Sequence, residues 1–411
     1  MRIIKCFIFL LAGILVLSCS DRKTVQIWTD RPEFAVYGEL FNTAQTRYKV
    51  SIKYYDNPGQ ELQKAGNTAD IIVGSWLKTS VTGAYFRSLD NLFGANKLSR
   101  GAFYPRLLSI GRIERNQYLL PVSFNIPALI FFKDSKIELS NSFTVDFNEI
   151  KTLSKNYNNI SREAYTKIGF SPLWSNDFLM ITSVLLGASF KTASPLSWDA
   201  SALERSMNFV NDWTTEFNTS IQAEEEFIFR YFFEPPEKLV QKERILFSYM
   251  DSRDFFILNE ESKSDLDYRW IMEQSRIPII EDMVLIGIPK RARSVKAARA
   301  FIQWFFTIEN QRLILEYCTE TKVSENVFGI CGGFSALNTV TEQVFPHYYP
   351  ELLGRMPPSN YLMTPNVLPG NWADIREKVV LPYLYDRSRS TKAEEVYPLE
   401  RRLADWMRMN R

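Results

Sequence analysis

Two β-type runs are joined by a short extended segment in the sequence Leu119-Leu120-Pro121-Val122-Ser123-Phe124-Asn125-Ile126-Pro127-Ala128-Leu129-Ile130-Phe131-Phe132. The runs at 119–122 and 128–132 consist of the aliphatic and aromatic residues that buried strands favour. The segment between them ends at Pro127, and the residue before a proline is held in an extended conformation. The sequence therefore predicts two strands that follow each other with no helix between them.

On the N-terminal side, strand-like and helix-like patterns alternate. Residues 25–28 and 69–74 are compact apolar runs, and residues 49–55 alternate like a strand. Between the first two strands, apolar residues recur at helical spacing from Phe34 to Tyr48. This alternation predicts an α/β sheet, in which ligands bind at the carboxyl ends of strands. Those ends are Thr29-Asp30-Arg31 and Gly74-Ser75-Trp76.

On the C-terminal side, the pattern predicts more helix. We expect helices at 179–189 and 202–217, the second capped by Asp199 or Ser201, and strands at 244–250 and 283–288. One long amphipathic helix is predicted from 295 to 317, and the tail from 371 to 409 reads as helices separated at 386–390.

Composition and charge exclude several classes of protein. The chain has 411 residues, of which 45% are hydrophobic and 23% charged, as in a globular protein. Its formal net charge is +2, from 49 basic and 47 acidic side chains, so no basic field for nucleic acid is present. Beyond the N-terminus no apolar run reaches the length of a membrane span.

The first residues predict export. Arg2 and Lys5 precede an apolar run from Cys6 to Leu17, which is the pattern of a secretory signal peptide. The sequence Val16-Leu17-Ser18-Cys19 resembles a bacterial lipobox, although Leu17 is larger than is usual there. The resemblance implies cleavage before Cys19 and attachment of lipid to it. An ordinary signal peptide with an incidental cysteine is the alternative.

Two cysteines would remain in the exported part of the chain. Cys318 and Cys331 could form a disulfide, which would close a short loop and contribute about 3 kcal/mol. The alternative is a pair of buried free thiols, and the separation of the two Cα atoms decides between them.

The residues for most common catalytic chemistries are missing. His347 is the single histidine, which excludes a zinc site made of several histidines and disfavours a Ser-His-Asp or Cys-His nucleophile. No phosphate-binding glycine loop, HExxH, CxxC or calcium-binding loop is present. We therefore expect no cofactor and no metal, and binding is favoured over catalysis.

The order of segments resembles that of the extracellular solute-binding proteins of bacterial ABC importers, in the class of the maltose-binding protein. The likeness runs from Val25 to about Met407. It rests on six segments. Ile27-Trp28-Thr29 resembles the family's opening strand, Ala69-Asp70-Ile71-Ile72-Val73 its second strand, and Tyr85-Phe86-Arg87-Ser88-Leu89-Asp90 its leucine-aspartate turn. Tyr118 to Asp134 resembles the first lobe crossing, Ala297 to Gln311 the most recognisable helix, and Thr391-Lys392-Ala393-Glu394-Glu395 the start of the last helix. One stretch, Lys242 to Asp251, lacks the small residues that the family has there.

The resemblance implies a periplasmic-binding-protein type II fold of the α/β class. Each of two lobes would be a mainly parallel sheet flanked by helices, with a ligand cleft between them. Residues 1–18 would be the signal peptide and 19–23 a lipid-anchored linker. The N-terminal lobe would comprise 24–123 and 284–327, and the C-terminal lobe 127–280 and 331–411. The chain would cross between lobes near 123–126, 281–284 and 324–330.

The resemblance also implies a function without covalent chemistry. A monomeric, lipid-anchored receptor on the outer side of a membrane would capture a small solute, with a sugar or oligosaccharide favoured, and deliver it to permease subunits. The expected ligand-binding residues are Trp174, Trp372, Trp76, Asp30, Arg31, Glu33, Ser75, Asn125, Arg253 and Asp254. Indole faces suit the apolar faces of sugars, and carboxylates and guanidinium groups bind hydroxyls.

Two other functions remain open at the level of sequence. The chain could be an exported hydrolase or lyase that acts on glycosides, or a surface lipoprotein that kept the fold and lost transport. A polyamine, an iron chelate or a peptide remain alternatives to a sugar as ligand.

Overall fold

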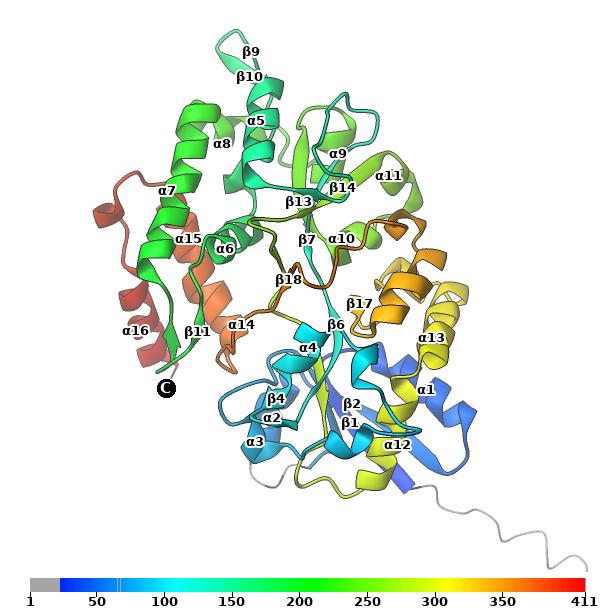
Figure 1. Cartoon of the computed structure of the whole chain (residues 1–411). Helices are drawn as coiled ribbons and strands as arrows, with labels where there is room; N and C mark the ends of the chain where they lie inside the picture. Colours follow the sequence, from blue (N-terminus) through cyan, green and yellow to red (C-terminus); the bar gives the residue numbers. More distant parts are fainter. Residues whose placement is uncertain (1–22, 65, 67, 411) are drawn as a thin grey trace, which may run out of the picture.

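Two lobes, each built on a β-sheet with helices packed around it, lie one above the other in the computed structural model (Figure 1). The structure describes residues 23–64, 66 and 68–410. The predicted signal peptide, Cys19 and nearly all of the predicted linker lie outside these residues. Among the described residues, no helix is both long enough and apolar enough to cross a membrane.

The sheet of the first lobe contains strands from three distant parts of the chain. In spatial order they are β17 (Phe334–Ser335), β6 (Leu120–Phe124), β16 (Val284–Gly287), β3 (Ile71–Gly74), β1 (Lys23–Thr29) and β2 (Tyr48–Tyr54). β1 is parallel to both β2 and β3, and β16 is antiparallel to both β3 and β6. Every residue of β3, β16 and β6 is buried, which explains why these strands read as continuous apolar runs.

The helices of the first lobe pack on this sheet. They are α1 (Phe34–Ala44), α2 (Pro58–Gln63), α3 (Thr82–Tyr85), α4 (Pro105–Ile110), α12 (Val295–Phe305) and α13 (Ile308–Glu320), with a small hairpin of β4 (Arg112–Ile113) and β5 (Asn116–Gln117). The prediction of one helix from 295 to 317 is wrong, because α12 and α13 are separate. The side chain of Thr307 accepts a hydrogen bond from the backbone N–H of Asn310 at 3.2 Å and so starts a second helix.

The sheet of the second lobe is more mixed than expected. Its order is β13 (Phe247–Asp251), β7 (Pro127–Phe132), β14 (Leu266–Ile271) and β8 (Thr144–Val145). β7 is antiparallel to both β13 and β14, and only β14 and β8 are parallel. The chain enters this lobe directly along β7 and not through a crossover helix, so the expectation of a mainly parallel sheet fails here. It also fails in the first lobe, where β16 pairs antiparallel with β3 and β6 and β17 pairs antiparallel with β6.

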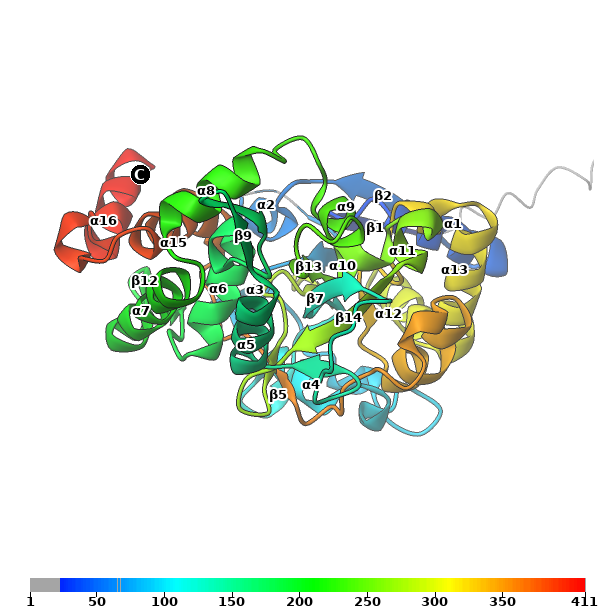
Figure 2. The same ribbon diagram turned by 90° about the horizontal axis from the view of Figure 1, so that it is seen from above.

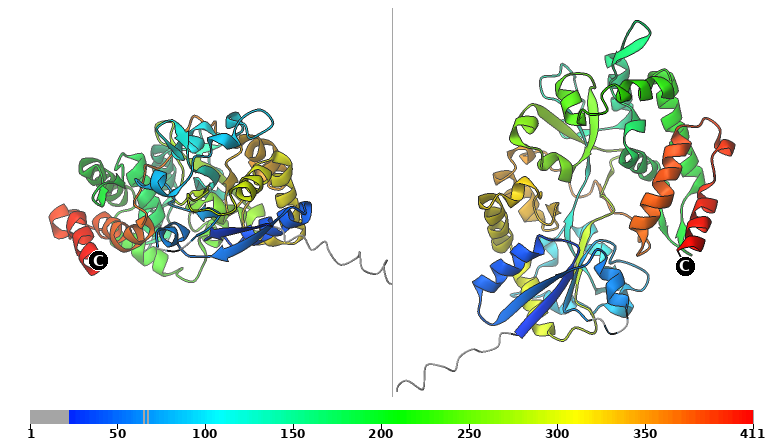
Figure 3. Two further views of the ribbon diagram at one scale, coloured as in Figure 1. Left: turned by 90° about the horizontal axis from the view of Figure 1, so that it is seen from below. Right: turned by 180° about the vertical axis from the view of Figure 1, so that it is seen from behind.

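The second lobe also holds most of the helices. They are α5 (Phe147–Tyr157), α6 (Asn176–Leu185), α7 (Ala200–Phe217), α8 (Ile221–Phe229), α9 (Pro236–Gln241), α10 (Ser252–Phe256), α11 (Glu260–Ser264), α14 (Trp372–Ile375), α15 (Leu381–Ser388) and α16 (Leu399–Met409). Figures 2 and 3 show α7, α15 and α16 together on one flank of this lobe. The predicted cap of α7 is confirmed, since Asp199 Oδ1 accepts a hydrogen bond from Ala202 N at 2.8 Å.

Short elements complete the structure. The remaining strands are β9 (Asn159–Ser161), β10 (Ala164–Lys167), β11 (Lys191–Thr192), β12 (Leu196–Ser197), β15 (Ile277–Pro278) and β18 (Leu362–Met363). The short 3-10 and π turns are η1 (Asp90–Leu92), η2 (Arg100–Ala102), η3 (Pro172–Trp174), η4 (Val323–Glu325), η5 (Val340–Val344), η6 (Phe345–His347), η7 (Pro350–Leu352), η8 (Arg376–Val380) and η9 (Ala393–Glu395).

The chain passes between the lobes at three places. The first passage joins β6 to β7 and the second joins β15 to β16, near the predicted positions. The third lies between β17 and β18, which is later than the predicted 324–330, because β17 still pairs with β6 in the first sheet. The other lobe boundaries stay predictions.

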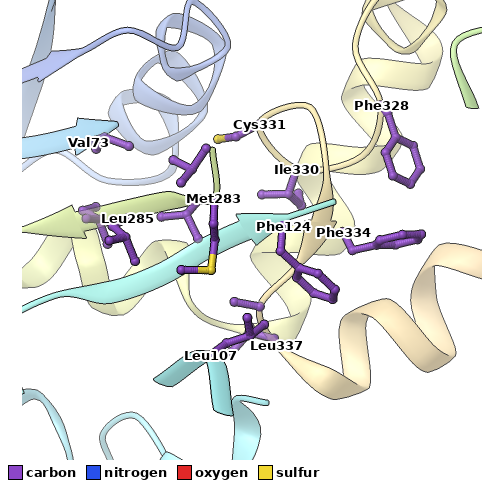
Figure 4. Packing of buried hydrophobic residues seen from close by; sticks show 14 of the residues in the cluster. Val73, Leu107, Phe124, Met283, Leu285, Phe328, Ile330, Cys331, Phe334 and Leu337 are labelled. Atoms are coloured by element: carbon purple, nitrogen blue, oxygen red, sulfur yellow. The ribbon is translucent and has the colours of Figure 1, made fainter. Parts of the chain in front are cut away.

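Aromatic rings fill the junction between the lobes. Phe334 on β17 lies 5.6 Å from Phe124 and 4.9 Å from Phe328, measured between ring centroids (Figure 4). Ile330 and Leu337 are buried in the same cluster. The junction is therefore a packed core and not an open hinge.

Cys318 and Cys331 are both buried and both free, so the structure contradicts the predicted disulfide. Cys318 lies on the buried side of α13, whereas Cys331 sits in a turn with a positive φ of 52°. The N–H of Cys331 donates to the hydroxyl of Tyr37 at 3.0 Å, which fixes that turn independently of Cys318. Burial raises the pKa of the Cys318 thiol to about 11, which favours the unreactive protonated form.

Candidate functional site

A cleft beside the crossings consists of three adjoining cavities. The acidic compartment has a volume of about 300 Å³, the apolar compartment about 220 Å³ and the outer compartment about 380 Å³. Glu281, in the passage from β15 to β16, lines all three. Trp76 of the first lobe lines the acidic and outer compartments. The lobes also touch at the rim, where Asn57 Nδ2 lies 3.5 Å from the carbonyl oxygen of Gly370.

The acidic compartment gathers charged side chains from the second lobe and from the crossing, and Trp76 closes it from the first lobe. Its charged residues are Asp177, Asp251, Asp254, Glu281, Asp282, Glu377, Arg253 and Arg376. Met180, Ile181, Ile280, Trp76 and Tyr249 provide most of the remaining wall. Polar groups on a partly apolar wall are typical of a site for a small hydrophilic ligand.

Arg376 ties the second lobe to the crossing. Its Nε donates to Glu281 at 2.8 Å, and its two other nitrogens bond Asp177 and Glu377. Burial alone would lower the pKa of Arg376, but the carboxylates of Glu281 and Asp177 raise it. The guanidinium therefore stays charged in the partly buried wall.

A second polar chain runs from the first lobe to the second through Asp282. Arg31 donates to the hydroxyl of Ser75 at 2.6 Å, and that hydroxyl donates to the carbonyl oxygen of Asp282 at 2.5 Å. The Asp282 carboxylate accepts from Arg253 at 2.6 Å. Burial would lower the pKa of Arg253, whereas Asp282 and Asp251 raise it above its usual value.

The remaining residues of the first predicted loop face inward. Asp30 Oδ1 lies 3.3 Å from Arg31 Nε, and burial raises the pKa of Asp30 against the opposing charge of Arg31. Glu33 lies near the two buried thiols. The pKa of Cys331 is raised mainly by burial and, to a smaller extent, by the charge of Glu33. Asp30, Arg31 and Ser75 thus adjoin the cleft through Asp282, while Glu33 lies behind them.

Trp76 has an unusual backbone. Its φ is +54°, in the left-handed region that bulky residues rarely adopt. Its Nε1 is shielded from solvent and has no hydrogen-bond partner among the described residues. Backbone strain of this kind, at a residue whose ring lines two compartments, is typical of a side chain held in place for binding.

Trp372, the first residue of α14, lines the apolar compartment. Its ring is 0% exposed and lies 5.8 Å from that of Phe190, and its Nε1 also lacks a described partner. Met180, Ile279 and Leu368 form further parts of this wall. In this conformation Trp372 belongs to the site as a covered wall residue and presents no open face for stacking.

Two predicted site residues lie away from the three compartments. Trp174 in η3 stacks on Phe227, with ring centroids 5.9 Å apart and planes at 17°, so its face already has a partner. Asn125 lies in the first passage, where its Nδ2 donates to the carbonyl oxygen of Gly332 at 2.8 Å and its Oδ1 accepts from Ser252 Oγ at 2.7 Å. The two hydrogen bonds of its amide group stabilise the crossing, so neither amide atom is free to bind a ligand.

Sequence reasoning placed Trp76, Arg253 and Asp254 in the cleft wall and missed several of their neighbours. Asp251 is the last residue of β13 and Asp282 lies two residues before the buried strand β16, and these positions at strand ends are a signal that would have identified them. Asp177 and Arg376 come from two helical segments far apart in the chain, and no local pattern indicates that they meet. In the described part of the chain, no cluster of three or more His, Cys, Asp or Glu side chains could hold a metal ion.

Comparison with solved structures identifies the fold. An ABC substrate-binding protein from Listeria monocytogenes in complex with cycloalternan shares 12% identity, with a TM-score of 0.62 over 94% of this chain and 97% of that chain. A cyclic alpha-maltosyl-1,6-maltose binding protein from Arthrobacter globiformis shares 13%, with a TM-score of 0.62 over 90% and 95%. The maltose/maltodextrin-binding domain MalE from Bdellovibrio bacteriovorus, bound to maltotriose, shares 13%, with a TM-score of 0.54 over 89% and 97%.

These likenesses confirm the two-lobed α/β fold of the maltose-binding type over nearly the whole described chain. The three similar structures are of binding proteins. No protein-family model and no curated protein matches the sequence.

Proposed function

We propose that the chain is the substrate-binding component of an ABC importer. It would capture a sugar or oligosaccharide in the cleft between the lobes and deliver it to a membrane permease without chemical change. The observation that carries this proposal is the continuous cleft at the crossings, whose walls come from both lobes and meet at Glu281. The shared fold with three sugar-binding proteins supports it.

The polar chains of the cleft support a closure mechanism. Arg376 and Arg253 of the second lobe bond the crossing residues Glu281 and Asp282, while Ser75 of the first lobe bonds Asp282 from the other side. A ligand in the acidic compartment that covers Trp76 and bonds Arg376 or Arg253 contacts both lobes at once. Its binding therefore favours the closed arrangement, and the permease would recognise that arrangement.

A panel of neutral and charged oligosaccharides tests the function. Calorimetric titration of the ligand-free protein should find at least one sugar that binds and raises the melting temperature. Product analysis of the same mixtures should find that sugar intact, in keeping with a receptor. The absence of any response across the panel would contradict the carbohydrate part of the proposal, and breakdown of a bound sugar would contradict the receptor part.

Trp76→Ala should weaken sugar binding about 30-fold. Loss of an indole face that a sugar covers removes roughly 2 kcal/mol of binding free energy. Calorimetry measures the change, and Trp406→Ala on α16 is the matched control that should bind like the unaltered protein. Trp76→Gly separates binding from folding, because glycine adopts the φ of 54° without strain. A Gly variant that folds and still binds normally would rule out this role.

We also propose that the chain is exported and held on the membrane by lipid at Cys19, which keeps the cleft close to the permease at high effective concentration. Cys19→Ala should move the protein from the membrane fraction to the soluble fraction. Sugar binding by the released protein should be unchanged, because the described cleft lies wholly within 23–410. Retention of the variant in the membrane fraction would contradict the anchor.

A further inference from the structure

The acidic compartment carries a local excess of negative charge. Six carboxylates and two guanidinium groups line it, whereas the chain as a whole has 49 basic and 47 acidic side chains. The excess is therefore a property of this cavity and not of the protein. A neutral ligand would leave this negative charge uncompensated.

The two arginines do not compensate all of the carboxylates. Arg376 pairs with Asp177, Glu281 and Glu377, and Arg253 pairs with Asp282. Asp251 and Asp254 form no ion pair with any residue that the structure describes. They lie on the same short stretch at the end of β13 and the start of α10.

A helix cap accounts for part of this arrangement. Asp251 Oδ1 accepts a hydrogen bond from the backbone N–H of Asp254 at 3.0 Å. The cap uses one oxygen of Asp251 and does not involve the carboxylate of Asp254. Burial and, after it, the charge of Asp254 together raise the pKa of Asp251 to about 6, against the lowering effect of Arg253. The two acids therefore repel each other beside a cavity.

The walls around these acids suit a cation attached to a larger body. The indole of Trp76 lines the same compartment, and the faces of indole rings attract ammonium groups. The apolar compartment adjoins through Met180, Ile181 and Glu281. Its Trp372 is 0% exposed and has an Nε1 that lacks an acceptor among the described residues.

We infer that the solute is a carbohydrate with a cationic amino group, whose ammonium lies between Asp251 and Asp254 while the sugar body extends toward Trp372. This inference rests on the proposed function and narrows its ligand class. Charge-assisted hydrogen bonds to two carboxylates distinguish an amino sugar from its neutral counterparts.

Three β-1,4-linked oligomers of equal length test the inference, because they differ only at carbon 2. Calorimetry at pH 7 should show that the glucosamine oligomer binds at least tenfold more tightly than the glucose and N-acetylglucosamine oligomers. Equal binding of all three would overturn the inference and leave the carbohydrate function standing. Binding of spermidine with no binding of any sugar would overturn the carbohydrate function and this inference with it.

Substitutions locate the ammonium. Asp251→Asn keeps the helix cap, because asparagine caps as well as aspartate, and Asp254→Asn alters an exposed side chain. In the double variant the affinity ratio of the glucosamine oligomer to the N-acetylated oligomer should fall to about one. Asp212→Asn, on the exposed face of α7, is the matched control and should keep the ratio. If the double variant does not fold, Asp254→Asn alone should lower the ratio, and an unchanged ratio in a folded variant overturns the assignment.

Discussion

Replacing Trp270 with alanine is expected to lower the free energy of unfolding by about 3–5 kcal/mol. The ring is 0% exposed on β14 and lies 4.7 Å from that of Tyr268 and 5.9 Å from that of Phe334. Because Phe334 belongs to the sheet of the first lobe, the indole packs the two lobes together. Its Nε1 also donates to the carbonyl oxygen of Arg355 at 2.7 Å. Urea denaturation followed by circular dichroism measures the loss.

Two further variants separate the sources of this effect. Trp270→Phe keeps most of the ring and leaves the Arg355 carbonyl without its donor, so it should cost about 1–3 kcal/mol. Trp304→Ala removes a partly exposed ring on α12 and should cost less than Trp270→Ala. A Trp270→Ala loss no larger than that of Trp304→Ala would show that the junction tolerates a cavity and that the lobes do not depend on this ring.

The strands and caps of this chain are predictable because their signals are local. β3 and β16 are fully buried, so their sequences are continuous apolar runs, and Asp199 precedes α7 by one residue. The break between α12 and α13 shows the limit of this reasoning. The apolar spacing continues across Thr307, and only the bond of its hydroxyl to Asn310 N reveals that a new helix begins.

The cleft is predictable only where a strand ends in it. Trp76 and Arg253 follow β3 and β13 closely, so position along a strand located them. Trp174 was assigned by resemblance, and its ring instead stacks on Phe227 in a lobe that is rich in aromatic residues. The contact of Arg376 with Asp177 joins residues that are 199 positions apart, and no local sequence pattern predicts it.

Ionisation of Glu224 should lower the stability of the protein by roughly 2–3 kcal/mol between pH 5 and pH 8, and Glu224→Gln should remove this contribution. Glu224 on α8 is 0% exposed. Its carboxyl group accepts hydrogen bonds from Ser171 and from Asn218, the latter at 2.6 Å. Burial raises its pKa from 4.5 to about 7 despite these bonds, which oppose the shift.

The direction of the pH effect follows from that raised pKa. The folded state binds the proton of Glu224 more tightly than the unfolded state does. Its contribution to stability is therefore complete below pH 4.5 and is lost as the pH rises through about 7. The raised pKa of Asp251 acts in the same direction, so the unaltered protein and each variant must be compared at every pH.

Glutamine keeps the shape of the side chain and cannot ionise. The stability of Glu224→Gln relative to that of the unaltered protein should therefore increase as the pH rises. Urea denaturation at intervals from pH 5 to pH 8 measures this difference. Glu226→Gln is the matched control, because Glu226 is exposed on the same helix and should keep the original slope. Parallel curves for Glu224→Gln and the unaltered protein would mean that Glu224 stays ionised when buried. In that case its bonds from Ser171, Thr214 and Asn218 would compensate fully for the lost hydration.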